Sequence, residues 1–138
     1  MADDLDLPSA ARRHRDAALL LDQDSPAGKR DVAGYLFGIA AECALKEIMR
    51  KVGIRPLPPE RRRDDPFYMH FPDLKTALLD YVQARGHIAL RRHAENSALM
   101  AEWSMTMRYA PGRDILSKPV ARWRHQALEL VNEMEAAQ

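Results

Sequence analysis

The chain has 138 residues, of which 46% are hydrophobic and 30% charged, and a formal net charge of +1. The length and composition are those of one ordinary globular domain over residues 1–138, and they exclude an intrinsically disordered chain. The net charge close to zero excludes a strong electrostatic field around the whole molecule that would attract nucleic acid. The single cysteine excludes an internal disulfide, and since neither a signal-peptide core nor an apolar run of ~20 residues is present, we expect a cytoplasmic protein without membrane contact.

The first predicted helix runs from about Pro8 to Gln23. Proline suits the first helical turn, and alanines and leucines then recur at the helical period and form an inward face that includes His14. The segment 24–28 contains serine, proline and glycine, and it is expected to break this helix from the next one.

The second predicted helix ends before Gly53 and is the most informative stretch of the chain. From 32 to 45 its residues are apolar or small on nearly every face, with the exception of Glu42. A helix that is apolar all round is a central helix. We therefore expect the residues around Ile39 and Cys43 to lie in the middle of the molecule, with other helices on all sides.

Residues 54–71 are expected to form a long loop, because they contain four prolines and a run of consecutive charged residues. Three further helices are predicted over 72–85, 88–103 and from about 118 to the C-terminal part of the chain. Together these elements predict an all-α fold, an antiparallel up-and-down bundle of four to five helices.

Three segments, taken in order, resemble the HEPN family, whose name abbreviates "higher eukaryotes and prokaryotes nucleotide-binding". They are the glycine-containing apolar stretch Gly34–Lys46, which carries Glu-Cys-Ala-Leu-Lys, then His70–Leu74 and Trp103–Tyr109. The resemblance covers roughly residues 8–135. It implies a small HEPN-like helical bundle that forms a homodimer and is encoded with, or fused to, a minimal nucleotidyltransferase.

Many proteins of this family are toxins or defence RNases. In these RNases an arginine and a histidine, separated by four to six residues, stand at the start of the last helix. The last helix here offers only Arg122-Trp123-Arg124-His125, in which the spacing is too short. Arg63 and His70 do meet the spacing, but they lie in the proline-rich loop. A cation and a group that titrates near neutrality suit metal-free RNA cleavage, so these two residues are the catalytic candidates.

Glu42 needs a partner, because an unpaired charge on an apolar helix is costly to bury. Lys46, His14 and Arg108 are the candidates. In one interpretation Glu42 belongs to a buried polar cluster that fixes the register of the helices. In the other, Glu42, Lys46, Arg108 and Tyr109 line a pocket for a nucleotide or an RNA phosphate. His70 likewise either packs at the start of the next helix or has a functional role.

The leading hypothesis is therefore a nucleotide- or RNA-binding module that is the effector or partner half of a toxin–antitoxin or defence pair with a nucleotidyltransferase. The alternatives are a metal-independent endoribonuclease that uses Arg63 and His70, and a structural adaptor that only dimerises. The sequence contains no phosphate-binding glycine loop and no zinc-binding histidine pair, so we expect no cofactor and no metal. Trp103 and Trp123 are expected in the core or at a dimer interface, and Cys43 as a buried, unreactive thiol.

Overall fold

The computed structural model describes residues 5–23 and 29–136, and these residues contain helices and no β-strand. The α-helices are α1 (Leu7–Leu21), α2 (Arg30–Lys51), α3 (Asp73–Arg85), α4 (Ile88–Ala94), α5 (Gly112–Leu116) and α6 (Val120–Ala136), and the 3-10 helices are η1 (Pro59–Asp64), η2 (Pro66–Tyr68) and η3 (Met105–Tyr109). The prediction of an all-α fold is confirmed. Among the described helices, none combines the length and the apolar character that a membrane span requires.

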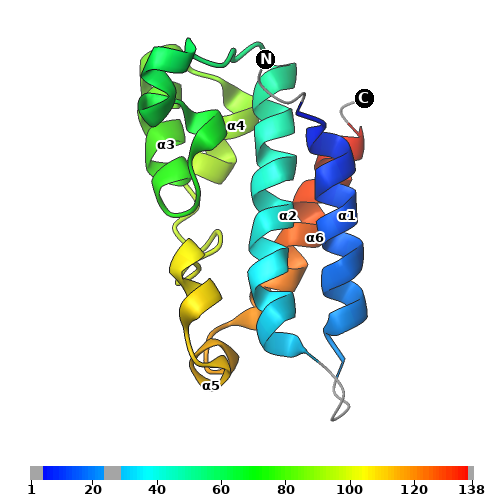
Figure 1. Cartoon of the computed structure of the whole chain (residues 1–138). Coiled ribbons are helices and arrows are strands. Elements are labelled where there is room, and N and C mark those ends of the chain that lie inside the picture. The colour runs from blue at the N-terminus through cyan, green and yellow to red at the C-terminus, as the bar shows by residue number, and fades with distance from the viewer. Residues whose placement is uncertain (1–4, 24–28, 137–138) are drawn as a thin grey trace.

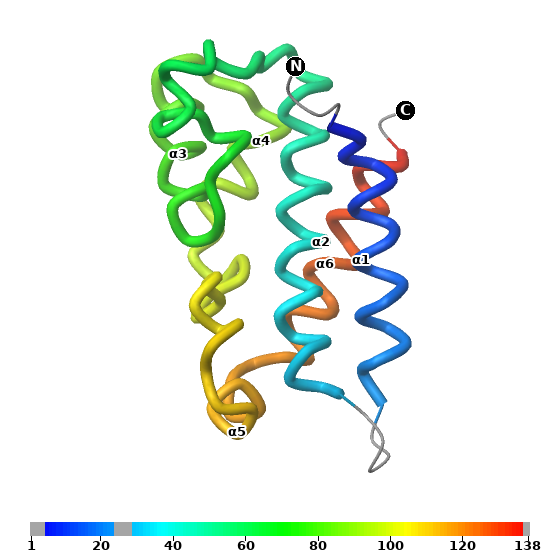
Figure 2. The backbone as a smooth tube through the Cα atoms, viewed as in Figure 1, coloured from blue at the N-terminus to red at the C-terminus, as the bar shows by residue number. Residues whose placement is uncertain are grey.

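The three long helices α1, α2 and α6 lie side by side, and α3 and α4 form a second group beside the end of α2 (Figure 1). The bounds of α1, α2, α3 and α6 lie close to those predicted. The predicted break at 24–28 falls outside the described residues. Among the three long helices, α2 and α6 run the same way, and α1 runs opposite to both (Figure 2).

The predicted fourth helix is shorter than expected, since α4 ends at Ala94 and not near Trp103. Met100 and Glu102 have positive φ angles of 49° and 71°, which a helix cannot accommodate. The side chain of Gln126 on α6 accepts a hydrogen bond from the backbone N–H of Met100 at 2.8 Å. This irregular path turns the chain away from α4 and brings Trp103 to the surface of α2.

Trp103 explains why glycine occurs within α2. Its indole Nε1–H donates to the carbonyl oxygens of Gly34 and Tyr35, both at 3.2 Å. A Cβ atom at Gly38 would lie only 2.0 Å from the Trp103 ring, and a Cβ at Gly34 would lie 3.2 Å from a methyl group of Val120. The two glycines therefore give up helix propensity, about 1 kcal/mol each, in exchange for close approach of the tryptophan and of α6.

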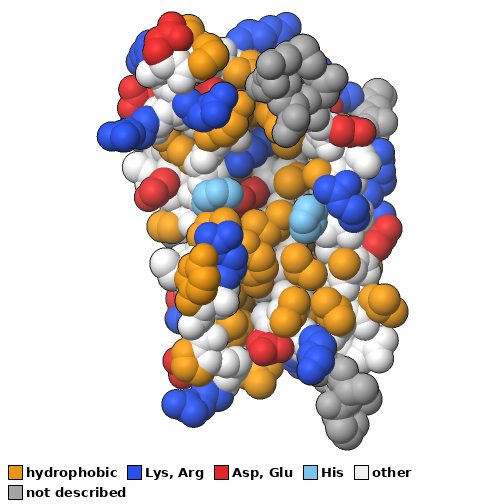
Figure 3. Space-filling view, in the orientation of Figure 1, with side chains coloured by type: hydrophobic (Ala, Val, Ile, Leu, Met, Phe, Trp, Pro, Cys, Tyr) orange, Lys and Arg blue, Asp and Glu red, His pale blue; other side chains and the backbone are white. Residues whose placement is uncertain are grey.

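One side of α2 is not covered, which corrects the expectation that the residues around Ile39 and Cys43 are surrounded on all sides. Val32 is exposed, and Leu36, Ile39 and Cys43 are half-buried. Their spacing of three or four residues places them in one stripe along the helix. The other sides of α2 pack against α1, α6 and the 103–116 segment, and hydrophobic side chains gather on the open face (Figure 3).

The segment from 54 to 71 contains two short 3-10 helices, η1 and η2, and no α-helix. It follows α2 and lies against α3, beside the end of α2 (Figure 2). Phe67 and Phe71 are buried in the core, so the segment is anchored at both residues. The short helix α5 was not predicted.

Candidate functional site

A buried carboxylate on α2 connects this helix to the end of the 54–71 segment. Glu42 is only 2% exposed. Its Oε1 is bonded to Nδ1 of His70 at 2.8 Å, and its Oε2 accepts a hydrogen bond from the backbone N–H of Phe71, also at 2.8 Å. The partner of Glu42 is therefore His70, from the second of the three segments that carry the resemblance, and His14 instead bonds to the carbonyl oxygen of Ala10.

Lys46 lies one turn further along α2 and is also buried. Burial raises the pKa of Glu42, although the hydrogen bond from His70 and the charge of Lys46 oppose the rise. Burial lowers the pKa of Lys46, while the charges of Glu42, Cys43 and Asp65 oppose this change. The spacing of Glu42 and Lys46 also permits an exposed ion pair, but in the structure both side chains are buried. Burial strengthens the electrostatic coupling between the two groups.

His70 is the accessible end of this cluster, because 44% of its side chain is exposed while that of Glu42 is enclosed. With Glu42 ionised, Nδ1 must carry the proton of their hydrogen bond, and Nε2 of the neutral ring is then free to accept a proton. A carboxylate that fixes the tautomer and orientation of an imidazole in this way is the arrangement used in general base catalysis. The geometry therefore gives His70 the chemistry of a general acid or base.

Asp65 is a member of this cluster that the sequence analysis missed. It is fully buried, and its carboxylate accepts hydrogen bonds from the backbone N–H groups of Leu57 at 2.9 Å and Phe67 at 3.0 Å. It thereby holds the 54–71 segment in its fold and adds a negative charge near Lys46. The Asp-Pro dipeptide, which favours the start of a turn, was the available signal, but the charged run around it suggested an exposed loop.

Arg63, the other catalytic candidate, lies on η1 and is exposed. Within the described part of the chain its side chain makes no interaction with His70. The structure thus places the two candidates on neighbouring segments of the 54–71 region without a contact between them.

Arg108 and Tyr109 lie apart from Glu42 and Lys46. Both are exposed on η3, where the Arg108 guanidinium lies 5.3 Å from the centre of the Tyr109 ring. Arg108 lines a pocket of about 250 Å³ with Asp31 at the first turn of α2. Eleven residues of helix, roughly 16 Å, separate Asp31 from Glu42. The four predicted ligand-binding residues therefore form two separate pairs.

Cys43 is half-buried beside this cluster and not fully enclosed as expected. Burial raises the pKa of its thiol to about 11, an effect that Lys46 opposes and Glu42 reinforces. Because the thiolate is the reactive form, the thiol is unreactive near neutral pH, in agreement with the prediction.

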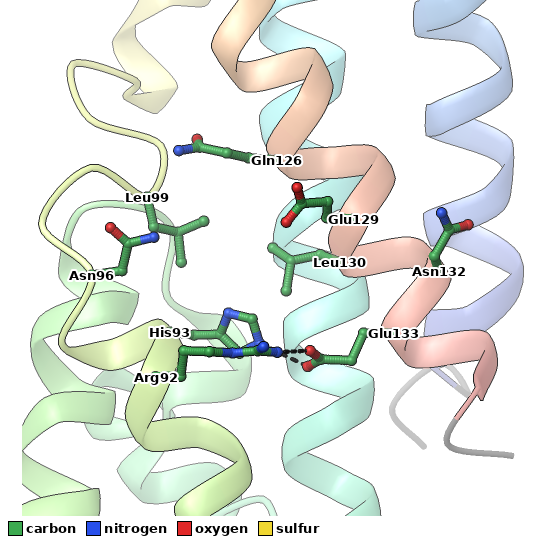
Figure 4. A pocket seen from close by; sticks show the side chains of 9 residues that line it. All are labelled: Arg92, His93, Asn96, Leu99, Gln126, Glu129, Leu130, Asn132 and Glu133. Atoms are coloured by element: carbon green, nitrogen blue, oxygen red, sulfur yellow. Dashed lines mark hydrogen bonds and ion pairs between the residues drawn. The ribbon is translucent and has the colours of Figure 1, made fainter.

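A polar cleft of about 350 Å³ between α4 and α6 is a second possible site. Figure 4 shows Arg92 and His93 side by side, both directed toward Glu133. His93 Nε2 lies 2.7 Å from a Glu133 oxygen, and Arg92 binds the other oxygen. Because Arg92 and His93 already bind Glu133, these side chains serve to join α4 to α6, and the cleft is a contact between the two helices.

The described residues contain no group of three or more histidine, cysteine, aspartate or glutamate side chains that could hold a metal ion. Comparison with known proteins gave no match to this chain among family models, curated proteins or solved structures. The geometry of the Glu42 cluster and the resemblance in the sequence are therefore the observations that bear on function.

Proposed function

We propose that this chain is a HEPN-like, cytoplasmic module that binds RNA or a nucleotide, and that it is the effector or partner half of a toxin–antitoxin or defence pair with a nucleotidyltransferase. The observation that carries the proposal is that two of the segments that resemble the family both contact the remaining one, which lies on α2. His70 bonds to Glu42, and Trp103 bonds to the carbonyl groups of Gly34 and Tyr35. The second and third segments therefore both pack against the stretch of α2 that carries the first segment, at two positions along this helix.

The chemistry of the site supports the same proposal. His70 presents a half-exposed imidazole at the surface, and the enclosed carboxylate of Glu42 fixes its orientation. An oriented imidazole can donate a hydrogen bond to a phosphate oxygen or exchange a proton with a ribose hydroxyl. Glu42 is then a positioning residue, and His70 is the group that meets the ligand.

The test is the binding of a fluorescently labelled RNA oligonucleotide and of ATP to the purified chain. We expect binding, and we expect His70→Ala to weaken it while the melting temperature stays within a few degrees of the wild type. His125→Ala is the matched control, because that imidazole is exposed on α6 and bonds only to Glu129 of the next turn. A wild-type chain that binds neither RNA nor nucleotide would overturn the proposal.

The open face of α2 supports the homodimer that belongs to this proposal. Val32, Leu36, Ile39 and Cys43 form an apolar stripe, and Leu20 of α1 is 70% exposed. A second copy of the chain would bury these side chains by a symmetric contact. Light scattering is expected to give twice the chain mass, and Ile39→Glu is expected to give a folded monomer. A monomeric wild type at high micromolar concentration would exclude the dimer.

The Glu42–His70 pair also favours one alternative, a metal-independent endoribonuclease. Incubation of bulk RNA with the protein in excess chelator tests it directly. Cleavage that His70→Ala abolishes and that Arg63→Ala reduces would support this activity. Equal cleavage by the wild type and the His70→Ala variant would identify a contaminating nuclease and end the enzyme hypothesis.

A further inference from the structure

A groove of about 570 Å³ lies between the 54–69 segment and α3, and it is separate from the contacts described above. Its floor is apolar and includes Ile54, Met69 and Ala77. Its rim carries three arginines, Arg55, Arg61 and Arg85, together with Tyr81 and two aspartates. A volume of this size accommodates a ligand as large as a nucleotide.

The three arginines of the groove form no ion pair with the described residues. Within the described residues, Arg55, Arg61 and Arg85 make no side-chain hydrogen bond or ion pair. The Arg85 guanidinium lies 5.2 Å from the centre of the Tyr81 ring, over its face. Arginines elsewhere on the surface, such as Arg12 and Arg124, bind carboxylates at 3.0 and 2.9 Å. Guanidinium groups without partners around an apolar floor favour an anionic ligand with an apolar body.

Aromatic rings accompany these arginines. The Tyr81 ring stacks on the His87 ring with their centres 5.1 Å apart. Outside the groove, on the same segment, the Arg62 guanidinium lies 4.7 Å from the centre of the Tyr68 ring, which is itself exposed. The alternation of cations and rings thus continues past the groove, which favours an extended polymer over a small molecule.

We propose that this groove, together with Arg62 and Tyr68, binds single-stranded nucleic acid. The guanidinium groups would contact the phosphates, and a base would stack on the exposed ring of Tyr68, which a duplex would not allow because its bases are stacked and paired. Met69 lines the groove and directly precedes His70. A strand in the groove would therefore pass next to the imidazole of the Glu42 cluster. This inference rests on the proposed function and identifies where its ligand binds.

The test is fluorescence anisotropy with a labelled twelve-residue oligouridine, measured at several salt concentrations. We expect Arg55→Ala and Arg85→Ala each to weaken binding about fivefold at low salt, and to make the logarithmic salt dependence shallower by about 0.7 for each lost phosphate contact. Tyr68→Leu, which keeps much of the apolar volume but removes the exposed aromatic ring, is expected to weaken binding with little change in the salt dependence. Arg122→Ala is the matched control, because Arg122 is exposed on α6 and makes no interaction with a described residue.

The possible outcomes separate this inference from the proposed function. If the wild type binds the oligonucleotide and the groove variants bind as well as the Arg122→Ala control, the groove is the wrong site and the proposed function stands. Equal affinity for a duplex of the same length, or for a mononucleotide, would overturn the assignment to single strands. A wild type that binds neither RNA nor nucleotide removes the proposed function itself.

Discussion

Two histidine–glutamate pairs in this molecule have similar bond lengths and opposite exposure. In the pair of Glu42 with His70 the carboxylate side chain is 3% exposed and the imidazole 44%. In the pair of Glu133 with His93 the carboxylate is 30% exposed and the imidazole 12%. The first arrangement presents an oriented imidazole to solvent, whereas the second encloses the imidazole between α4 and α6. Exposure, and not bond length, therefore distinguishes a pair that can meet a ligand from one that joins helices.

The largest expected effect is the loss of stability when Glu42 is removed. Glu42→Ala leaves Lys46 buried without its nearest anion and removes the acceptor of the Phe71 N–H, so we expect a cost of about 3–5 kcal/mol in the free energy of unfolding. Glu133→Ala, the equivalent change in the other pair, should cost about 1 kcal/mol or less, because its partners are partly solvated. Denaturant unfolding measures both values, and equal costs would remove the contrast between the pairs.

The pH dependence of stability gives a smaller effect with a defined sign. Burial raises the pKa of Glu42 above its ordinary value of 4.5, so at pH values between 4.5 and the raised pKa the folded chain holds a proton there that the unfolded chain has released. The stability that Glu42 contributes is therefore highest below pH 4.5 and falls as the pH rises through its folded-state pKa.

Glu42→Gln should remove this fall, so the stability difference between variant and wild type should shift in favour of the variant as the pH rises from 4 to 7. Chemical denaturation at several pH values measures the difference. Glu133→Gln serves as the control for a histidine-paired carboxylate that is partly solvated. A constant difference for Glu42→Gln across this range would show that Glu42 does not titrate as its burial requires.

The histidines themselves should behave differently when they are replaced. His93→Ala is expected to cost about 1 kcal/mol, because it opens a contact between α4 and α6. His70→Ala should cost less, since its ring is half-exposed and the Phe71 N–H still holds Glu42. Thermal unfolding measures both, and a larger loss for His70→Ala would assign a structural role to the imidazole.

The smallest effect is expected at Cys43. Its raised pKa, about 11, should make alkylation by iodoacetamide at pH 8 much slower than that of a free thiol. Because the charge of Glu42 contributes to this pKa, Glu42→Gln should accelerate the reaction several-fold. Glu133→Gln should not change it, and alkylation of the wild type at the rate of a free thiol would contradict the account of this environment.

The long helices were predictable because their apolar residues follow the helical period and their ends carry proline or glycine. The turn after Ala94 was not predictable. Lys75 on α3 donates to the carbonyl oxygens of Asn96 and Leu99, and Gln126 holds Met100 from α6. These partners are distant in the sequence, so local periodicity carried no information about them.

The candidate site was predicted in part. The sequence indicated Glu42 because a charge on an apolar helix needs a partner, and it indicated His70 by spacing, but it did not connect the two residues. Their contact depends on the path of the 54–71 segment, which the buried side chain of Asp65 fixes through backbone hydrogen bonds. Glu42 and Lys46 do not lie with Arg108 and Tyr109 for a different reason. Arg108 lies near Asp31 at the first turn of α2, and residues on one helix can face different neighbours along its length.

The proposed binding site for nucleic acid is the side of the molecule formed by the 54–71 segment and α3. Photo-crosslinking of the wild-type chain to a single-stranded RNA that contains 4-thiouridine, followed by mass spectrometry of the peptides, tests it most directly. The account predicts crosslinks within residues 54–87, at or near Tyr68, His70 and Tyr81. Crosslinks confined to peptides of α1, α4 or α6 would contradict it.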